Sequence, residues 1–300
     1  MAEFGKIVIF GTGLIGGSFA LALKEAGAVE EVVGFGRTPA TLKLAQELGV
    51  IDRAGINPAH EVGDADIVLV ATPVAQMPEI FERIVPYLGV DTIVTDGGST
   101  KGDVVAAARA AFKGHIGKFV PAHPIAGAEN SGPGAARADL YRGKKVVVTP
   151  LPENKYERLD RIKRAWALCG VDIYELTPEV HDQVFAAVSH LPHLLSFALV
   201  HDLAMRRDAD MFFTFAASGF RDFTRIAASH PEMWRDICLA NRSALLEELD
   251  GYRRELDDIR EALVSSDGKR VEEIFFIART ARQAWVEGLT IASAKVVARI

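Results

Sequence analysis

Short apolar runs alternate with longer helical patterns through the first half of the chain. The runs are rich in β-branched residues and bounded by turns, which is typical of buried strands. Their alternation with helices predicts a parallel sheet covered on both faces. The predicted strands lie at 6–10, 31–35, 66–71, 92–96, 145–149 and 171–176.

Beyond Leu176 no strand-like alternation recurs, and the helical period takes over. Thr177 and Pro178 are typical of a helix start, as cap and first-turn residue. We therefore predict an α/β domain over residues 1–176 and an all-α domain over residues 177–300. The first helix of that second domain is expected at 180–205, with an interruption at Pro192, which removes a backbone hydrogen bond.

The last third of the chain carries one apolar seam on two helices. Apolar residues recur at alternating spacings of four and three from Leu245 to Leu263, and a second run from Val271 to Trp285 follows a turn at 266–268. This pattern predicts an αα-hairpin. Because such a seam needs a partner surface, we expect a homodimer through these C-terminal helices.

Composition narrows the class of protein. The 300 residues are 49% hydrophobic and 25% charged, with a formal net charge of −6, which favours a globular protein with a small-molecule substrate over a nucleic-acid platform. Cys169 and Cys238 lie far apart, so neither a disulfide scaffold nor a metal cluster is expected. No signal peptide or membrane-length apolar run stands out, so we expect a cytoplasmic protein without a membrane partner.

A glycine-rich turn joins the first strand to a helix. It reads Gly11-Thr12-Gly13-Leu14-Ile15-Gly16, the G-x-G-x-x-G spacing in the strand–turn–helix context of a dinucleotide-binding (Rossmann) fold. The glycines allow the tight turn, the approach of a pyrophosphate and close helix–strand packing, and the helix N-terminus faces the phosphate charge. Thr72 and Pro73, at the end of a neighbouring strand, are expected beside the same cofactor.

The second strand ends at Gly36-Arg37-Thr38. NAD-preferring sites usually place an acidic residue there to bind the ribose 2′-hydroxyl, and none lies between Phe35 and Thr41. Arg37 instead offers a cation for a 2′-phosphate, with the Thr38 hydroxyl beside it. The predicted cofactor is therefore NADP, with NAD as the alternative if Arg37 is only a solvated loop residue.

Two residues in the first domain are candidates for catalysis. His123 precedes a proline, which favours an extended backbone and cannot join a strand ladder, so we expect this imidazole on a loop at a strand end. There it is either a catalytic group or a structural histidine hydrogen-bonded to a backbone carbonyl. Ser99 follows two glycines after a strand, where its hydroxyl either faces a ligand or caps the next helix.

The second domain adds candidates for substrate binding. His190 and His193 lie three apart on one helix face, without the carboxylate or cysteine of a metal site, so one is expected to face a ligand and the other to brace the helix. Arg221 and Arg225 lie in apolar surroundings, where a guanidinium binds a substrate carboxylate or forms a structural ion pair.

Five motifs in this order resemble the prephenate/arogenate dehydrogenases, the cyclohexadienyl dehydrogenases of tyrosine biosynthesis. The resemblance covers essentially the whole chain and implies an N-terminal dinucleotide-binding domain followed by a helical dimerisation domain. It also implies the oxidative decarboxylation of prephenate or L-arogenate to 4-hydroxyphenylpyruvate or L-tyrosine, with hydride transfer to NADP or NAD. The motifs are G-T-G-L-I-G-G-S at 11–18, D-G-G-S-T-K at 96–101, H-P-I-A-G-A-E at 123–129, S-H-L-P-H at 189–193 and G-F-R-D-F-T-R at 219–225.

The resemblance also implies roles for single residues. His123 matches the catalytic histidine that accepts the proton of the substrate hydroxyl, which suits an imidazole. Ser99 matches the serine that orients this histidine, within direct or water-mediated hydrogen-bond reach. His193 and Arg225 match substrate-binding residues, and Glu129 would gate the pocket through an ion pair.

Two rival functions stay open at this point. A β-hydroxyacid dehydrogenase or imine reductase shares the domain plan but leads one to expect a lysine in the helical domain, and none lies between Thr177 and Asp267. A non-catalytic NADP sensor would bind a partner through its helical hairpin and would need no catalytic set.

Four features of the predicted enzyme are not decided by the sequence. They are the choice between prephenate and L-arogenate, the strictness of NADP over NAD, inhibition by tyrosine, and whether Arg225 or Arg221 holds the carboxylate. The chain runs from the first strand to the seam helix, so we expect no fused chorismate mutase or regulatory domain. Tyrosine would then have to inhibit at the active site.

Overall fold

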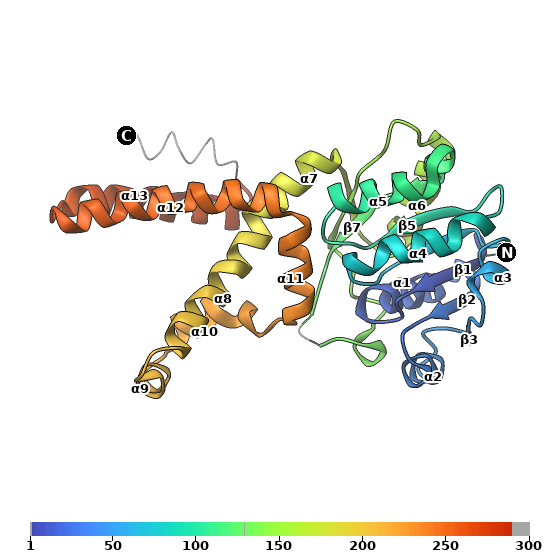
Figure 1. Ribbon diagram of the computed structural model, residues 1–300, viewed down its shortest axis with the longest axis horizontal. Helices are drawn as coiled ribbons and strands as arrows, with labels where there is room; N and C mark the ends of the chain where they lie inside the picture. The colour runs from blue at the N-terminus through green and yellow to red at the C-terminus, as the bar shows by residue number, and fades with distance from the viewer. Residues whose placement is uncertain (1, 129, 290–300) are drawn as a thin grey trace. The chain divides into compact units, whose positions relative to one another are not determined.

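The computed structural model describes residues 2–128 and 130–289 (Figure 1). The chain forms two compact units, residues 1–245 and 246–300. The first unit contains the α/β region together with the helices that follow it, so this division falls later in the chain than Leu176. The predicted domain boundary after Leu176 stays a prediction.

A six-stranded parallel sheet forms the N-terminal region, as the alternation of strands and helices predicted. Its strand order is β3-β2-β1-β4-β5-β6, so the order reverses between β1 and β4. Open α/β sheets bind their ligands at the carboxyl ends of the strands at such a reversal. The strands are β1 (Phe4–Phe10), β2 (Val29–Phe35), β3 (Arg53–Ala54), β4 (Ile67–Val70), β5 (Ile93–Asp96) and β6 (Phe119–Val120).

Helices cover both faces of this sheet, which explains its continuous apolar strands. In β1, Ile7 and Ile9 pack in one core with α1 (Leu14–Glu25) and α6 (Tyr156–Leu168). Val8 and Phe10 point the other way, into a core with α4 (Met77–Ile84) and α5 (Gly102–Phe112). Successive side chains alternate across a strand, so a strand buried on both sides has no polar face.

A second, smaller sheet contains His123. It consists of β7 (Ala122–Ile125), β8 (Lys145–Val148) and β9 (Asp172–Glu175), in that order, with β7 antiparallel to β8. The prediction that His123 lies on a loop is therefore wrong, since His123 pairs with Val147 and Pro124 with Val146. An edge strand accepts a proline because one side of it needs no backbone N–H donor.

A long helical run follows β9. Thr177 caps α7 (Pro178–Phe185) by accepting a hydrogen bond from the Val180 N–H at 3.3 Å, as predicted. A π-helical segment, η5 (Ala186–His190), then separates α7 from α8 (Leu191–Ala204). Pro192 lies in the first turn of α8, so the predicted interruption is confirmed, and the wider turn of η5 accommodates the missing N–H.

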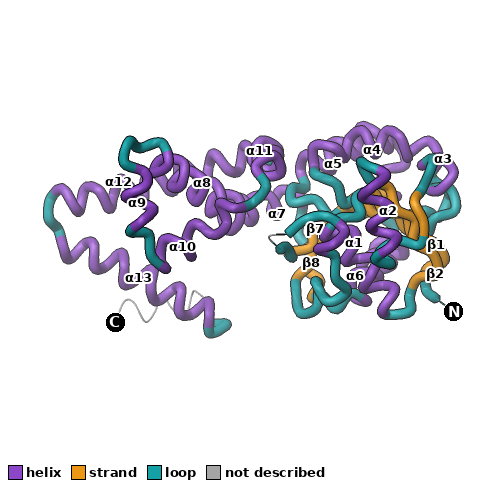
Figure 2. Tube along the Cα trace, turned by 90° about the horizontal axis from the view of Figure 1, so that it is seen from below, coloured by secondary structure: helices purple, strands orange, loops and turns teal. Residues whose placement is uncertain are grey.

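The remaining described elements of the first unit are helical. They include α9 (Ala209–Thr214), α10 (Ser218–Thr224), the 3₁₀-helix η6 (Arg225–Ala228) and α11 (Pro231–Ala240). In Figure 2 the described residues from α7 to α13 (Gly268–Val286) are drawn as helices and loops, without a strand.

Among the described residues, the helical run Pro178–Ala204 is long and apolar enough to cross a membrane. One such helix is weak evidence of a membrane span, because the core helices of soluble proteins pass the same test.

The second unit contains the predicted helical pair. The helices are α12 (Arg242–Val264) and α13 (Gly268–Val286), and Asp267 caps α13 by accepting a hydrogen bond from the Arg270 N–H at 3.0 Å. Large apolar side chains of both helices stay exposed in the single chain, including Leu263 at 63% and Trp285 at 67%. Exposed apolar surface of this kind is typical of a protein–protein contact.

Candidate active site

The glycine-rich turn forms a cradle that side chains would block. Gly11 has a φ of +96°, and a Cβ there would lie 2.6 Å from the Ala71 carbonyl oxygen. A Cβ at Gly16 would lie 2.2 Å from the Gly11 oxygen. At Gly13 the surroundings are open, because the nearest atom to an added Cβ would be 3.9 Å away. The first and third glycines thus allow the turn and its packing, and the second leaves room for a ligand.

Polar groups without hydrogen-bond partners in the described structure line the glycine cradle. The Thr12 and Thr72 hydroxyl oxygens are buried and have no hydrogen-bond partner in the described structure. The N-terminus of α1, formed by Leu14 and Ile15, has no side-chain cap. Unpaired backbone donors at a helix start and buried hydroxyls suit a phosphate-bearing ligand, so these residues fit a dinucleotide. Pro73 is exposed just after β4.

The end of β2 has a less specific arrangement. Arg37 is exposed, and no acidic side chain accompanies it between Phe35 and Thr41. The Thr38 hydroxyl caps α2 (Pro39–Glu47) by accepting a hydrogen bond from the Thr41 N–H at 3.2 Å. Thr38 therefore has a structural role in addition to the predicted one, and contact of Arg37 and Thr38 with a 2′-phosphate stays a prediction.

His123 begins a chain of hydrogen bonds to two residues of α7. Its Nδ1 lies 2.8 Å from Nε2 of His181, and Nδ1 of His181 lies 2.8 Å from Oδ1 of Asp182. The His123 ring also packs on Phe185, with ring centroids 4.9 Å apart. Among the described hydrogen bonds none joins His123 directly to Ser99, and the predicted contact with Ser99, direct or through one water, stays a prediction.

The loop after β5 holds both ends of this series of hydrogen bonds in place. Asp96 accepts a hydrogen bond from the Ala122 N–H at 3.1 Å, next to His123, and forms a fully buried ion pair with Lys101. The backbone N–H of Lys101 donates to Oδ1 of Asp182 at 2.8 Å, and the N–H of Gly102 donates to Oδ2 at 2.7 Å. One loop thus fixes the histidine strand and the helix that supports it.

The cofactor cradle and the His123 strand meet at this loop. A Cβ added at Gly97 would lie 3.0 Å from Cγ2 of Ile15 and 3.8 Å from Cδ of Pro124. Ile15 belongs to the glycine-rich turn and its helix, and Pro124 follows His123. A ligand bound at the N-terminus of α1 would therefore lie close to the His123 strand.

Burial controls the charge of these groups. It lowers the pKa of His123 well below 6.5, with His181, Lys101 and His190 adding to the effect, so His123 is neutral near pH 7. Burial also lowers the pKa of His181. For Asp182, burial acts to raise the pKa, but hydrogen bonds from His181 and from two backbone N–H groups outweigh it, so the pKa is lowered and the carboxylate stays charged.

His190 braces the helical run against the loop after β5. Its ring is bonded to the backbone of Ser99, and its Nδ1 lies 3.1 Å from the Asn241 amide nitrogen. Burial lowers the pKa of His190 to about 4. A neutral ring that donates to the Ser99 carbonyl and accepts from Asn241 satisfies both nitrogens. This leaves Ser99 half-buried on the loop, and its predicted role stays a prediction.

The charge of Arg225 acts on His193. The His193 ring stacks on Trp234 with centroids 3.5 Å apart, and its Nδ1 lies 2.9 Å from the Ser189 carbonyl oxygen. Burial lowers the pKa of His193, and the nearby charge of Arg225 lowers it further. Both Arg221 and Arg225 line a hollow of about 430 Å³ that also contains Phe213 and Phe220. The sequence left the choice between these two arginines undecided, and of the two only the charge of Arg225 lowers the pKa of His193.

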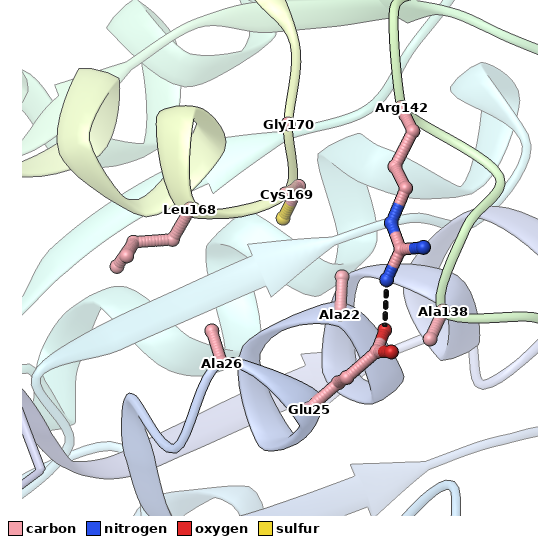
Figure 3. Close-up of a pocket in the computed structure, with 8 residues that line it drawn as sticks. All are labelled: Ala22, Glu25, Ala26, Ala138, Arg142, Leu168, Cys169 and Gly170. Carbon is pink, nitrogen blue, oxygen red and sulfur yellow. Dashed lines mark ion pairs between the residues drawn. The ribbon is translucent and has the colours of Figure 1, made fainter.

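A second hollow of about 220 Å³ lies away from these groups. Glu25 and Arg142 form an ion pair of 2.8 Å across it, and the buried Cys169 lines the same hollow (Figure 3). None of the predicted site residues lines it. Glu129 lies outside the described residues.

Sequence reasoning missed the residues that support His123. His181, Asp182 and the buried pair of Asp96 and Lys101 were not singled out. The available signal was a histidine–aspartate pair in the second turn of the helix that Thr177 caps, together with the lysine that ends the D-G-G-S-T-K motif. Among the described residues, no group of three or more His, Cys, Asp or Glu could hold a metal ion.

Comparison with known proteins identifies the family. The model of the prephenate dehydrogenase nucleotide-binding domain matches residues 19–175, and that of the prephenate dehydrogenase dimerization domain matches residues 177–276. Cyclohexadienyl dehydrogenase from Zymomonas mobilis is 34% identical over 95% of this chain and 97% of its own. Prephenate dehydrogenase from Bacillus subtilis is 34% identical over 92% of this chain and 75% of its own.

A solved structure agrees. Prephenate dehydrogenase from A. aeolicus, in complex with hydroxyphenyl propionate and NAD+, superposes with a TM-score of 0.83 at 36% identity, covering 90% of this chain and 94% of that one. Both halves of the chain match the same family, in sequence and in fold. The chain therefore belongs to the prephenate dehydrogenase family of NAD(P)-dependent oxidoreductases.

Proposed function

We propose that this protein catalyses the oxidative decarboxylation of prephenate, of L-arogenate or of both, with NADP preferred over NAD. The observation that carries the proposal is the neutral His123, whose Nδ1 is hydrogen-bonded to His181. His123 lies on β7, and the next residue, Pro124, lies near Gly97 in the loop beside the dinucleotide cradle. Family membership supplies the substrate class. Arg37, without an acidic residue beside it, supports NADP.

The chemistry of the site follows from its residues. His123 would accept the proton of the substrate hydroxyl, because an uncharged imidazole is the side chain suited to general-base catalysis near neutral pH. When bound, the nicotinamide supplies the hydride acceptor. Loss of hydride and proton turns the carbinol into a carbonyl. Loss of the ring carboxylate as CO2 then leaves its bonding electron pair in the ring, which becomes aromatic as the carbonyl oxygen becomes a phenolate and takes up a proton.

Substrate binding is assigned to the helical side of the site. Arg225 would bind a substrate carboxylate, which a guanidinium does in bidentate geometry, and His193 would contact the substrate from beside Trp234. Ser99 would face the nicotinamide side from the loop after β5. The exposed hollow shared by Arg221 and Arg225 supports this assignment.

We further propose a cytoplasmic homodimer. The matched dimerization domain and the exposed apolar side chains of α12 and α13 support the homodimer, and two free cysteines are compatible with a reducing compartment. Sedimentation of the purified protein as a monomer at micromolar concentration would contradict the dimer.

The function is tested with purified protein, two substrates and two cofactors. Prephenate or L-arogenate is mixed with NAD or NADP, and reduced cofactor is followed by absorbance. We expect turnover in at least one combination, faster with NADP. The absence of turnover in all four combinations would contradict the proposed reaction, and a wide preference for NAD would contradict only the argument from Arg37.

A further inference from the structure

The hydrogen bonds behind His123 have a fixed direction. Asp182 is a carboxylate and can only accept, so Nδ1 of His181 carries the proton of the 2.8 Å bond between them. Nε2 of the neutral His181 then has a lone pair and must accept from His123. The proton of His123 therefore lies on Nδ1, and its Nε2 is left with the lone pair.

The supports of Asp182 make this direction stable. Two backbone N–H groups and His181 donate to its two oxygens, and together they keep the carboxylate charged in spite of burial. His181 itself is fully buried, so water cannot replace the carboxylate as its partner. The charged and titratable groups that face the two rings are Asp182, Asp96, Lys101 and His190. Of these, only Asp182 is hydrogen-bonded to either ring.

We propose that His181 and Asp182 are positioning residues that hold His123 in the tautomer with a free Nε2. In this arrangement Nε2 is ready to take the hydroxyl proton of the substrate. The imidazolium that forms keeps its Nδ1–H bond to His181, and this bond is stronger when the donor is charged. The proposal rests on the proposed function for the identity of the proton donor, but the tautomer itself is a property of the protein alone.

Three variants separate positioning from general packing. His181→Phe keeps a ring of similar size in the apolar contact with Phe185 but removes the acceptor for His123. His181→Gln restores an acceptor, since its side-chain oxygen can receive the His123 Nδ1–H. His201→Phe is the matched control, because His201 is an exposed histidine of α8 outside the site.

The tautomer is measured directly by NMR. Long-range ¹H–¹⁵N correlation spectra of protein labelled at histidine nitrogens report which ring nitrogen is protonated, and the His123→Asn spectrum assigns the signal. We expect the Nδ1–H form in the wild type and in His201→Phe, and a mixture of both forms in His181→Phe. A wild-type His123 protonated on Nε2, or no change in His181→Phe, would overturn the proposal.

Kinetics provide the second readout. We expect His181→Phe to lower kcat about 10- to 100-fold, as loss of an orienting partner typically does, with substrate KM within about threefold of the wild type. His181→Gln should recover a substantial part of that loss. Equal losses in the two variants, or a wild-type kcat in His181→Phe, would contradict positioning. If the wild-type protein turns over neither substrate, the proposed function fails, and the NMR result still decides the tautomer.

Discussion

The surroundings of His123 and the hollow at Arg225 differ in how deeply their side chains are buried in the single chain. Around His123, the side chains of Asp96, Lys101 and His181 are fully buried. Asp96 is hydrogen-bonded to Lys101 and to the Ala122 N–H, and His181 is hydrogen-bonded to His123 and Asp182. At the hollow, α10 and η6 contribute no buried residue, and Phe223 is half exposed. The first region is buried within the single chain, and the side chains of the second are exposed.

This difference suits two separate tasks. Proton transfer requires atoms held at fixed distances and in one protonation state, which buried and fully bonded groups provide. Recognition of a substrate carboxylate requires an accessible cation that is desolvated only when the ligand, or a second subunit, covers it. Changes at His123 should therefore act on turnover, and changes at the hollow should act on substrate affinity.

The largest effect is expected for His123→Asn. Asparagine cannot accept the proton at neutral pH, and loss of a general base lowers kcat by roughly 10²–10⁴-fold. Cofactor affinity, measured by fluorescence titration, should stay close to that of the wild type, because the glycine cradle is untouched. Retained turnover would mean that His123 has only a structural role.

The pH dependence of the wild type sharpens the same point. Burial lowers the pKa of His123 well below 6.5. Because the active form is the neutral one, kcat/KM should hold steady from neutral pH down past 6.5 and fall only as the pH passes through the lowered pKa. An acid limb centred at or above pH 6.5 would contradict this environment for His123.

Lys101→Met should give the next largest effect, on stability. It leaves the Asp96 carboxylate buried without its cation, and breaking a buried ion pair from one side costs about 3–5 kcal/mol of unfolding free energy. Urea unfolding followed by circular dichroism measures the loss. Arg221→Ala is the control from the exposed hollow, and a similar loss there would remove the contrast between the two regions.

The sheet and the cradle were predictable because their signals are local. Each apolar strand and the G-x-G-x-x-G motif is contained in a short stretch of the chain, and Pro192 marked the interruption before α8. The support of His123 was not predictable in this way, since His123 and His181 are 58 positions apart and Lys101 and Asp182 are 81 apart.

The placement of His123 in a strand was also not predictable from local signals. Proline argues against a strand from local backbone geometry alone. Whether it is tolerated depends on β7 lying at the edge of its sheet, and that position follows from pairing with β8, more than twenty positions further along the chain. Local rules therefore predicted the elements better than the contacts between them.

Arg225→Ala should affect affinity more than turnover. A charge-assisted hydrogen bond to a carboxylate contributes enough that its loss should raise substrate KM roughly 10- to 100-fold, with a smaller change in kcat. Arg221→Ala, in the same hollow, should change KM by less than about threefold because, of the two arginines, only Arg225 lowers the pKa of His193. Steady-state kinetics with both variants decide between them, and the reverse order would transfer the carboxylate-binding role to Arg221.

Arg37→Ala should have the smallest effect of the set and tests the cofactor end of the site. Arg37 is exposed, so its contact with a 2′-phosphate would be partly screened by solvent, and we expect KM for NADP to rise about tenfold. KM for NAD should stay within about twofold, because NAD has no 2′-phosphate to lose. Raising the salt concentration should weaken NADP binding in the wild type but much less in the variant. Equal changes for the two cofactors would show that Arg37 does not read the 2′ position, and the preference for NADP would then need another residue at the end of β2.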